Sequence, residues 1–112
     1  MKLTSRQARQ TIRTRTRTQR AAARIARRGN GTLTTHAIAA GLTPSEARSV
    51  AGSLRKAAAK LDIHGEAGVS RTKGRARACT RYTRQQVAAI AVVYRPRKPA
   101  YRLAATRLTL AA

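Results

Sequence analysis

The sequence predicts a mainly α protein with one small β-hairpin, built within the 112 residues of a single domain. Two capping boxes, at residues 43–46 and 83–86, each precede apolar residues at helical spacing. Between these helices, residues 65–82 are rich in Gly and Arg, and their second half alternates basic with small or apolar side chains. That alternation is typical of a strand that pairs across a turn.

The charge of the chain predicts a polyanionic partner. There are 25 Lys and Arg against 3 Asp and Glu, a net charge of +22, and residues 1–28 and 67–112 hold no acid at all. Leu, Ile, Val and Phe make up 18 of 112 residues, so the core must be small. Repulsion within so basic a chain opposes folding, and nucleic acid is the polyanion that relieves it. Arg outnumbers Lys 20 to 5, which favours bidentate contacts to phosphate or guanine.

Several classes of function are excluded by what the sequence lacks. Cys79 is the single cysteine and the two histidines lie far apart, so neither a disulfide nor a metal site is expected. Three carboxylates offer little acid–base chemistry, so we expect no enzyme and no cofactor. The longest apolar run, residues 87–94, is too short to span a membrane. With no secretory pattern, a cytoplasmic location is expected, at the nucleoid or in the host cytoplasm if the protein is viral.

The N-terminal segment, residues 1–17, is predicted to be a basic arm. Arg13, Arg15 and Arg17 alternate with threonines, so in an extended chain they line one side and could contact phosphates or enter a minor groove. A disordered tail, or the polar start of a long first helix, would give the same pattern, and both alternatives stay open. A helix is then expected over residues 19–28, before a Gly-Asn-Gly turn.

Two helices joined by a tight turn follow. The first is short, is capped by Thr34 or Thr35, buries Ile38 and ends at Gly41, a residue type that accepts the left-handed conformation. The second covers residues 44–61 and has Pro at its first position. One face of this second helix carries an apolar stripe that consists of Ala47, Val50, Ala51, Leu54, Ala57, Ala58 and Leu61.

The opposite face of the helix at residues 44–61 is predicted to bind DNA. Its first side chains are small and its later ones cationic, so short groups can reach base edges while the helix N-terminus favours phosphate. Arg48 could pair with O6 and N7 of guanine, and Gly52 either lets a partner approach closely or is merely tolerated. Glu46 is expected to cap the helix rather than to read a base. The candidate residues on this face are Ser45, Arg48, Ser49, Gly52, Arg55 and Lys56.

A β-hairpin is predicted after this helix. Residues 61–64 are expected to form its first strand and residues 75–82 its second, around a Gly-rich basic tip. Its cations could straddle a phosphate backbone or probe a minor groove. A disordered Gly/Arg loop that becomes ordered only on binding would look similar. The candidate residues of the hairpin are Arg71, Lys73, Arg75 and Arg77.

The C-terminal part begins with a helix over residues 84–94. Its apolar side either covers the core or forms a homodimer contact, and core packing is the simpler interpretation. The Pro- and Arg-rich linker behind it offers phosphate contacts from Arg95, Arg97 and Lys98. Residues 95–112 are expected to form a basic extension, whose last part is ambiguous between helix and strand.

The order of helix, short helix, turn, long helix and basic hairpin resembles the winged helix-turn-helix superfamily over residues 18–83. The resemblance implies a three-helix core with the helix at residues 44–61 in the major groove and the hairpin as a wing, and we expect the domain to cover residues 18–94. The sequence departs from the usual form at His36, which stands where an aliphatic residue is expected. The first helix of the pair is therefore expected to be short or shifted, with His36 as a half-buried capping or packing residue.

Most members of this superfamily regulate transcription, so the leading hypothesis is a small protein that binds double-stranded DNA. A transcriptional regulator of the kind carried by phages or mobile elements fits the small size. An RNA-binding structural protein, such as a ribosomal component, is the main alternative, because long basic arms and few acids suit it as well. A non-specific nucleoid or packaging protein comes third, and predicts a steep salt dependence with no sequence preference.

Overall fold

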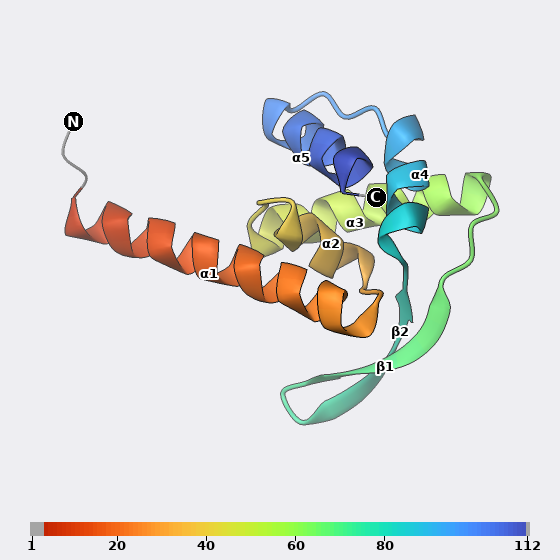
Figure 1. Cartoon of the computed structure of the whole chain (residues 1–112), viewed down its shortest axis with the longest axis horizontal. Helices are drawn as coiled ribbons and strands as arrows, with labels where there is room; N and C mark the ends of the chain where they lie inside the picture. The colour runs from red at the N-terminus through yellow and green to blue at the C-terminus, as the bar shows by residue number, and fades with distance from the viewer. Residues whose placement is uncertain (1–3, 112) are drawn as a thin grey trace.

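The computed structural model describes residues 4–111, the side chain of Thr72 excepted. Within them the protein is mainly helical with one small antiparallel hairpin, as the sequence predicted (Figure 1). The elements are α1 (Ser5–Arg28), α2 (Leu33–Ala39), α3 (Pro44–Lys60), β1 (Glu66–Thr72), β2 (Arg75–Arg81), α4 (Arg84–Val93) and α5 (Pro99–Leu110).

The core lies where α2, α3, α4 and α5 meet. Its largest fully buried side chains are Val50 and Leu54 from α3 and Val87 and Ile90 from α4, and Leu108 is the largest contribution of α5. Burial of one such side chain contributes about 1.5–3 kcal/mol. Because alanines fill most of the remaining interior, these few larger residues carry most of the hydrophobic stabilisation.

Capping boxes fix where three of the helices begin. The boxes at Thr43 and Thr83 confirm the prediction: each threonine hydroxyl accepts from the backbone N–H three residues on, and the side chain there accepts from the threonine N–H. A third box, at Thr4, was not predicted and starts α1. A cap of this kind contributes about 1 kcal/mol.

α1 is much longer than the helix expected over residues 19–28, because it begins at Ser5. Its N-terminal half projects from the body (Figure 1), and its buried residues, Ala21 and Ile25, lie near the other end. Of the alternatives for residues 1–17, the structure therefore shows the polar start of a long first helix from Ser5 on, and residues 1–3 lie outside the described part. The capping box, and the lack of Gly and Pro up to the end of the helix, account for this difference.

α2 is short, as expected, but it starts earlier than predicted. Its N-cap is Thr32 rather than Thr34 or Thr35. An isolated bridge between Gly31 and Tyr82 keeps the preceding chain extended, so the helix begins directly after it. The inward face of α2 consists of Leu33, His36 and Ala37, with Ile38 half-buried beside them instead of buried.

The end of α3 differs from the prediction, because residues 61–64 are not a strand. Leu61 is the C-cap and is 40% exposed, so it does not continue the apolar stripe. Asp62 is left-handed (φ 55°), and the N–H groups of Asp62 and Ile63 donate to carbonyls in the last turn of α3. These bonds form a Schellman motif, which closes the helix and leaves this segment without strand pairing. The hairpin therefore starts later, with β1.

The two strands of the hairpin join through a two-residue loop. β1 and β2 pair from Glu66 opposite Arg81 to Thr72 opposite Arg75. The loop between them consists of Lys73 and Gly74, which both have positive φ (53° and 76°). Two positive φ angles in a two-residue loop are the pattern of a type I′ turn, whose twist matches that of the strands.

The C-terminal segment forms α5, which packs on α4 (Figure 1). Residues 99–110 therefore complete the core, which differs from the basic extension expected over residues 95–112. Arg107 Nη1 donates to the backbone carbonyl of Ala40 at 2.9 Å and ties α5 to the turn between α2 and α3. The residues that α5 buries, at helical spacing, are Ala104, Ala105 and Leu108.

Candidate nucleic-acid interface

The candidate site is the face of α3 that points away from the core. Because Val50, Leu54 and Ala58 turn inward, residues on the opposite side of the helix face solvent. A Cβ built on Gly52 would meet no atom within 4 Å, so nothing in the protein covers this part of the face. All six predicted residues lie here: Ser45, Arg48, Ser49, Arg55 and Lys56 are exposed, and Gly52 is half-exposed. The face is open, has no side chain at Gly52 and is cationic toward the C-terminal end of the helix.

Glu46 serves the helix rather than this face. Its Oε1 accepts from the N–H of Thr43 at 3.2 Å and from the hydroxyl of Thr43 at 3.0 Å. The carboxylate is the single acid of α3, and these bonds engage it at the helix N-terminus, where negative charge is favourable. The expectation that Glu46 is a cap is confirmed, and the open face keeps its positive charge.

The register of the hairpin divides its four predicted cations between three places. Side chains alternate across a strand, so Arg75 and Arg77 share one face of β2. Arg71 of β1 pairs with Ala76 and lies on the other face. Lys73 is at the tip, in the turn. All four side chains are exposed, and the hairpin presents paired arginines on one face only.

A groove of about 600 Å³ lies between the hairpin and helices α2 and α3. Arg55 of α3 and Arg77 of β2 both line it, so the cationic end of α3 and the arginine face of the hairpin open onto the same space. The structure thus brings together two sets of residues that the sequence predicted separately. The remaining lining residues are Thr32, Leu33, Thr34, Ser70, Ala78, Cys79, Thr80 and Tyr82.

His36 holds the base of the hairpin against α2. The residue is 3% exposed, and its Nε2 lies 2.7 Å from the carbonyl oxygen of Tyr82. The backbone of Tyr82 also forms two hydrogen bonds with the backbone of Gly31. Burial lowers the pKa of His36, the bond to Tyr82 opposes this shift, and the positive charge of Arg84 adds to it. The neutral ring is the form that burial favours, and its Nε2–H donates to the carbonyl. Of the two expected roles, capping and packing, His36 has the packing role, and it is buried rather than half-buried.

The arginines predicted for the arm lie on two sides of α1. Arg13 and Arg17 surround a hollow of about 290 Å³ together with Arg6 and Arg9. Arg15 lies elsewhere on the helix, among glutamine and threonine side chains. The strip of alternating arginines is thus broken up by helical geometry. Arg6 and Arg9 were not predicted, although their spacing of three and four residues from the next arginines is a signal that the sequence contains.

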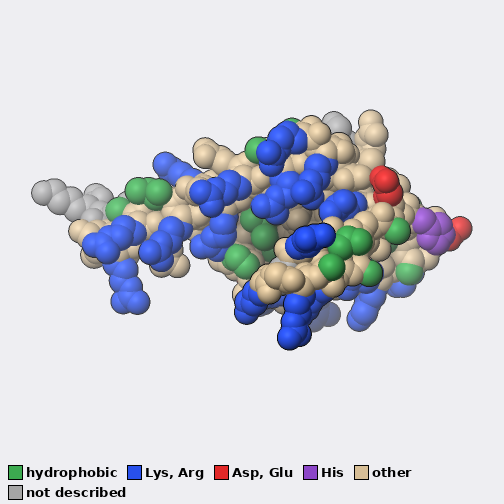
Figure 2. All heavy atoms as spheres, turned by 90° about the horizontal axis from the view of Figure 1, so that it is seen from below, with side chains coloured by type: hydrophobic (Ala, Val, Ile, Leu, Met, Phe, Trp, Pro, Cys, Tyr) green, Lys and Arg blue, Asp and Glu red, His purple; other side chains and the backbone are tan. Residues whose placement is uncertain are grey.

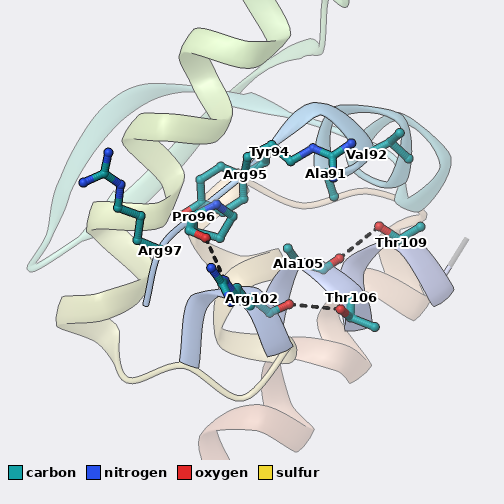
Figure 3. Close-up of a pocket in the computed structure, with 10 residues that line it drawn as sticks. All are labelled: Ala91, Val92, Tyr94, Arg95, Pro96, Arg97, Arg102, Ala105, Thr106 and Thr109. Carbon is teal, nitrogen blue, oxygen red and sulfur yellow. Dashed lines mark hydrogen bonds between the residues drawn. The ribbon is translucent and has the colours of Figure 1, made fainter. Parts of the chain in front are cut away.

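The linker cations lie at the junction of α4 and α5, around a pocket of about 640 Å³ (Figure 3). Arg95 and Arg97 line this pocket, and Arg102 donates to the linker backbone at 3.2 Å. Figure 3 shows the guanidinium of Arg97 pointing away from the threonines of α5. Lys98 instead lies over the ring of Tyr101, with Nζ 5.3 Å from the ring centre. The three predicted phosphate contacts are exposed, but they do not converge on one point.

The cations of residues 4–111 lack carboxylate partners. The acids are engaged elsewhere, because Glu66 accepts from Asn30 at 3.1 Å and Asp62 pairs with His64 at 2.8 Å. No Lys or Arg of the described residues forms an ion pair with an acid. Figure 2 shows Lys and Arg side chains along α1 and over the body, while the acidic side chains in view lie at the end far from the N-terminus. Such uncompensated charge is available to phosphates.

The structure can be compared with two expectations about membranes and dimers. In the described part of the chain, no helix combines the length and the apolar character that crossing a membrane requires. α4 buries one side in the core and leaves Val92 and Val93 exposed, so a homodimer contact through this helix stays a prediction. Comparison of the chain with known protein families, with curated proteins and with solved structures finds no match.

Proposed function

We propose that this chain is a small protein of the winged helix-turn-helix type that binds double-stranded DNA and regulates transcription. It would act in the cytoplasm, at the nucleoid or, if viral, in its host. The observation that carries the proposal is the open face of α3 around Gly52, which shares a groove with a basic hairpin. Three helices followed by a hairpin is also the order that the resemblance implies.

In the proposed complex, α3 lies in the major groove. Ser45 and Ser49 are short enough to reach base edges, and Arg48 pairs with O6 and N7 of a guanine. The missing side chain at Gly52 lets the groove approach the helix backbone. Arg55 and Lys56, one to two turns further along α3, contact phosphates and position the module without reading sequence.

The hairpin contacts the backbone beside that groove. Arg75 and Arg77 share a face, and Arg77 opens onto the same groove as Arg55. Lys73 extends the reach of the hairpin from its tip, whereas Arg71 lies on the other face from Arg75 and Arg77 and does not line this groove, so it is a weaker candidate. The hairpin would thus act as a wing that follows a phosphate strand or enters a minor groove.

Selection of bound sequences from a random duplex library tests this proposal, because base reading must enrich a motif. Arg48→Ala should then weaken binding to the selected site by about 1–3 kcal/mol and relax the preference at one base pair. Lys60→Ala is the matched control, since it removes one exposed charge from the end of the same helix. Equal, uniform weakening by both variants on every sequence would contradict base reading.

An RNA-binding structural role is the second candidate, and α1 favours it. The first four turns of this helix bury no residue and are rich in arginine, as suits a basic extension that inserts into a folded RNA. Competition between duplex DNA and a structured RNA at one salt concentration separates the two candidates. Preference for the RNA, with no motif enriched from the duplex library, would favour this role over DNA binding.

A further inference from the structure

α1 carries a row of arginines along one side. Successive members are three or four positions apart, so they fall on one face of the helix. At about 1.5 Å of rise per residue, the row is about 30 Å long. Its first four members line one hollow together, which shows that they share a face. We call this row the arginine stripe; it consists of Arg6, Arg9, Arg13, Arg17, Arg20, Arg24 and Arg27.

The side of α1 opposite the stripe is polar and almost uncharged. Arg15 is the arginine that lies there, among Gln7, Thr11 and Thr14. The hydroxyls of both threonines donate to backbone carbonyls four residues earlier, so these side chains are turned onto the helix itself. A helix that binds lipid needs a continuous apolar side opposite its cations, and Ile12 is the one large apolar side chain between Ser5 and Arg20. The segregated charge of α1 therefore fits a hydrated polyanion better than a membrane surface.

Apart from the capping box at Thr4, few interactions stabilise the N-terminal half of α1. No residue from Ser5 to Arg20 is buried, and the first turn has no acid to favour the helix N-terminus. Like charges four residues apart, such as Arg9 with Arg13 and Arg13 with Arg17, repel each other. No carboxylate of the described residues offsets this repulsion. A row of phosphates removes the repulsion and uses the whole length of the stripe.

We infer that the arginine stripe is a second DNA-docking surface, which lies along the phosphate backbone of the duplex held by α3. This inference rests on the proposed function. A length of about 30 Å is close to one helical turn of B-DNA, about 34 Å. Over one turn a straight row crosses both strands, and each crossing brings phosphates within reach of the arginines beside it. The stripe adds affinity and no sequence preference, because it contacts no base edge.

A composition-matched variant tests the inference. Thr11→Arg with Arg13→Thr, and Arg17→Gln with Gln19→Arg, move two charges from the stripe to the side of Arg15. All four positions are exposed, and composition and net charge stay the same. Binding to a mixed-sequence 30-base-pair duplex is measured over a series of salt concentrations. The salt slope is the steepness with which the logarithm of the binding constant decreases with the logarithm of the salt concentration. Because two phosphate contacts are lost, its magnitude should decrease by about 2, and affinity at the lowest salt should decrease by about tenfold.

A second pair of variants guards against an effect on folding. Arg13→Gln and Arg15→Gln each remove one charge from the same turn of α1, and circular dichroism checks that helix content is equal. Arg13→Gln should lower the salt slope by about 1, and Arg15→Gln should leave it nearly unchanged. Unchanged binding by the rearranged variant, or equal effects of the two single variants, overturns the inference. So does weaker binding to a structured RNA while duplex binding is unchanged.

Failure of the stripe and failure of the proposed function can be told apart. The rearranged variant should enrich the same motif from a random duplex library as the unchanged chain does, while binding every duplex more weakly. Arg48→Ala should do the reverse and alter the motif. If the stripe variants change nothing while Arg48→Ala alters the motif, the stripe is wrong and the α3 site stands. If no motif is enriched at all, the proposed base reading is wrong whatever the stripe does.

Discussion

Nε2 of His36 lies 2.7 Å from the backbone carbonyl oxygen of Tyr82, so a side chain in α2 holds the residue at which the hairpin ends. The same carbonyl accepts from the N–H of Gly31 at 3.0 Å, and the N–H of Tyr82 donates back to Gly31 at 2.7 Å. One buried ring therefore joins α2, the connection from α1 and the base of the hairpin. The orientation of the hairpin relative to the α3 face depends on this junction.

Replacing His36 should destabilise the protein and loosen the hairpin. His36→Leu removes the Nε2–H donor from the Tyr82 carbonyl, which keeps its bond from Gly31, so the free energy of unfolding should fall by about 1 kcal/mol. Urea denaturation measures this loss, and amide exchange at Gly31 and Tyr82 reports on the hairpin base. The control is His64→Leu, whose side chain is 84% exposed and which should change stability by about 0.5 kcal/mol or less. Similar small changes in both variants would contradict the structural role of His36.

Stability should fall as the pH drops below about 6.5. Because the pKa of His36 is lowered from 6.5 in the fold, the unfolded chain binds a proton at this residue before the folded protein does. The contribution of the neutral ring is thus complete above pH 6.5 and is lost progressively until the pH reaches the lowered value. Thermal unfolding from pH 8 to pH 5 measures this dependence. In His36→Gln the same range should give a flatter curve, and an unchanged slope would show that other groups cause it.

The tip of the hairpin allows stability and binding to be separated. Lys73 occupies a left-handed position (φ 53°) before Gly74, where asparagine is the favoured residue of a type I′ turn. Lys73→Asn should raise the free energy of unfolding by up to about 1 kcal/mol while removing one cation. If the tip contacts phosphate, DNA binding weakens and the salt slope falls by about 1 in a more stable protein. Unchanged binding would remove the tip from the interface.

Gly52 tests how closely a partner approaches α3. Its face is open, so Gly52→Leu should fit the free protein and raise the free energy of unfolding by about 0.5–1 kcal/mol through helix propensity. The added side chain would then stand between the helix and the groove, and DNA binding should weaken by tenfold or more, measured by fluorescence anisotropy. Ala89→Leu, at an exposed position of α4, is the control for a new surface leucine. Binding that survives Gly52→Leu would place the interface elsewhere.

Local signals were enough to predict much of the fold. The threonine at each capping box and its partner three residues on are determined by a few neighbouring atoms, so the boxes at Thr43 and Thr83 were found from sequence alone. The same signature at Thr4 was overlooked, because the alternating arginines behind it also suit an extended chain. The left-handed residue that closes α3, Asp62, carries no glycine to mark it, and its segment was therefore assigned to a strand.

The candidate site divides in the same way. The exposed positions of α3 follow from its amphipathic pattern, although Leu61 of the predicted stripe is exposed, and DNA binding by this face stays a prediction. The grouping of the hairpin cations was not predicted, because it depends on a strand register that starts at Glu66. A shift of this register by one residue would move each side chain to the other face of the hairpin. The approach of Arg77 to Arg55 depends on packing between distant elements. His36 was recognised as unusual, but its partner, 46 residues away, was beyond any local pattern.

The bond from Arg107 to the Ala40 carbonyl lets α5 support the turn between α2 and α3. Cutting the chain before Pro99 would remove that guanidinium and also strip the apolar cover from α4. Variants shortened to remove residues that look like a tail would thus lose the arrangement of helices that they were meant to preserve. Reporters or tags attached after Leu110 need a flexible spacer, so that α5 can still pack on α4.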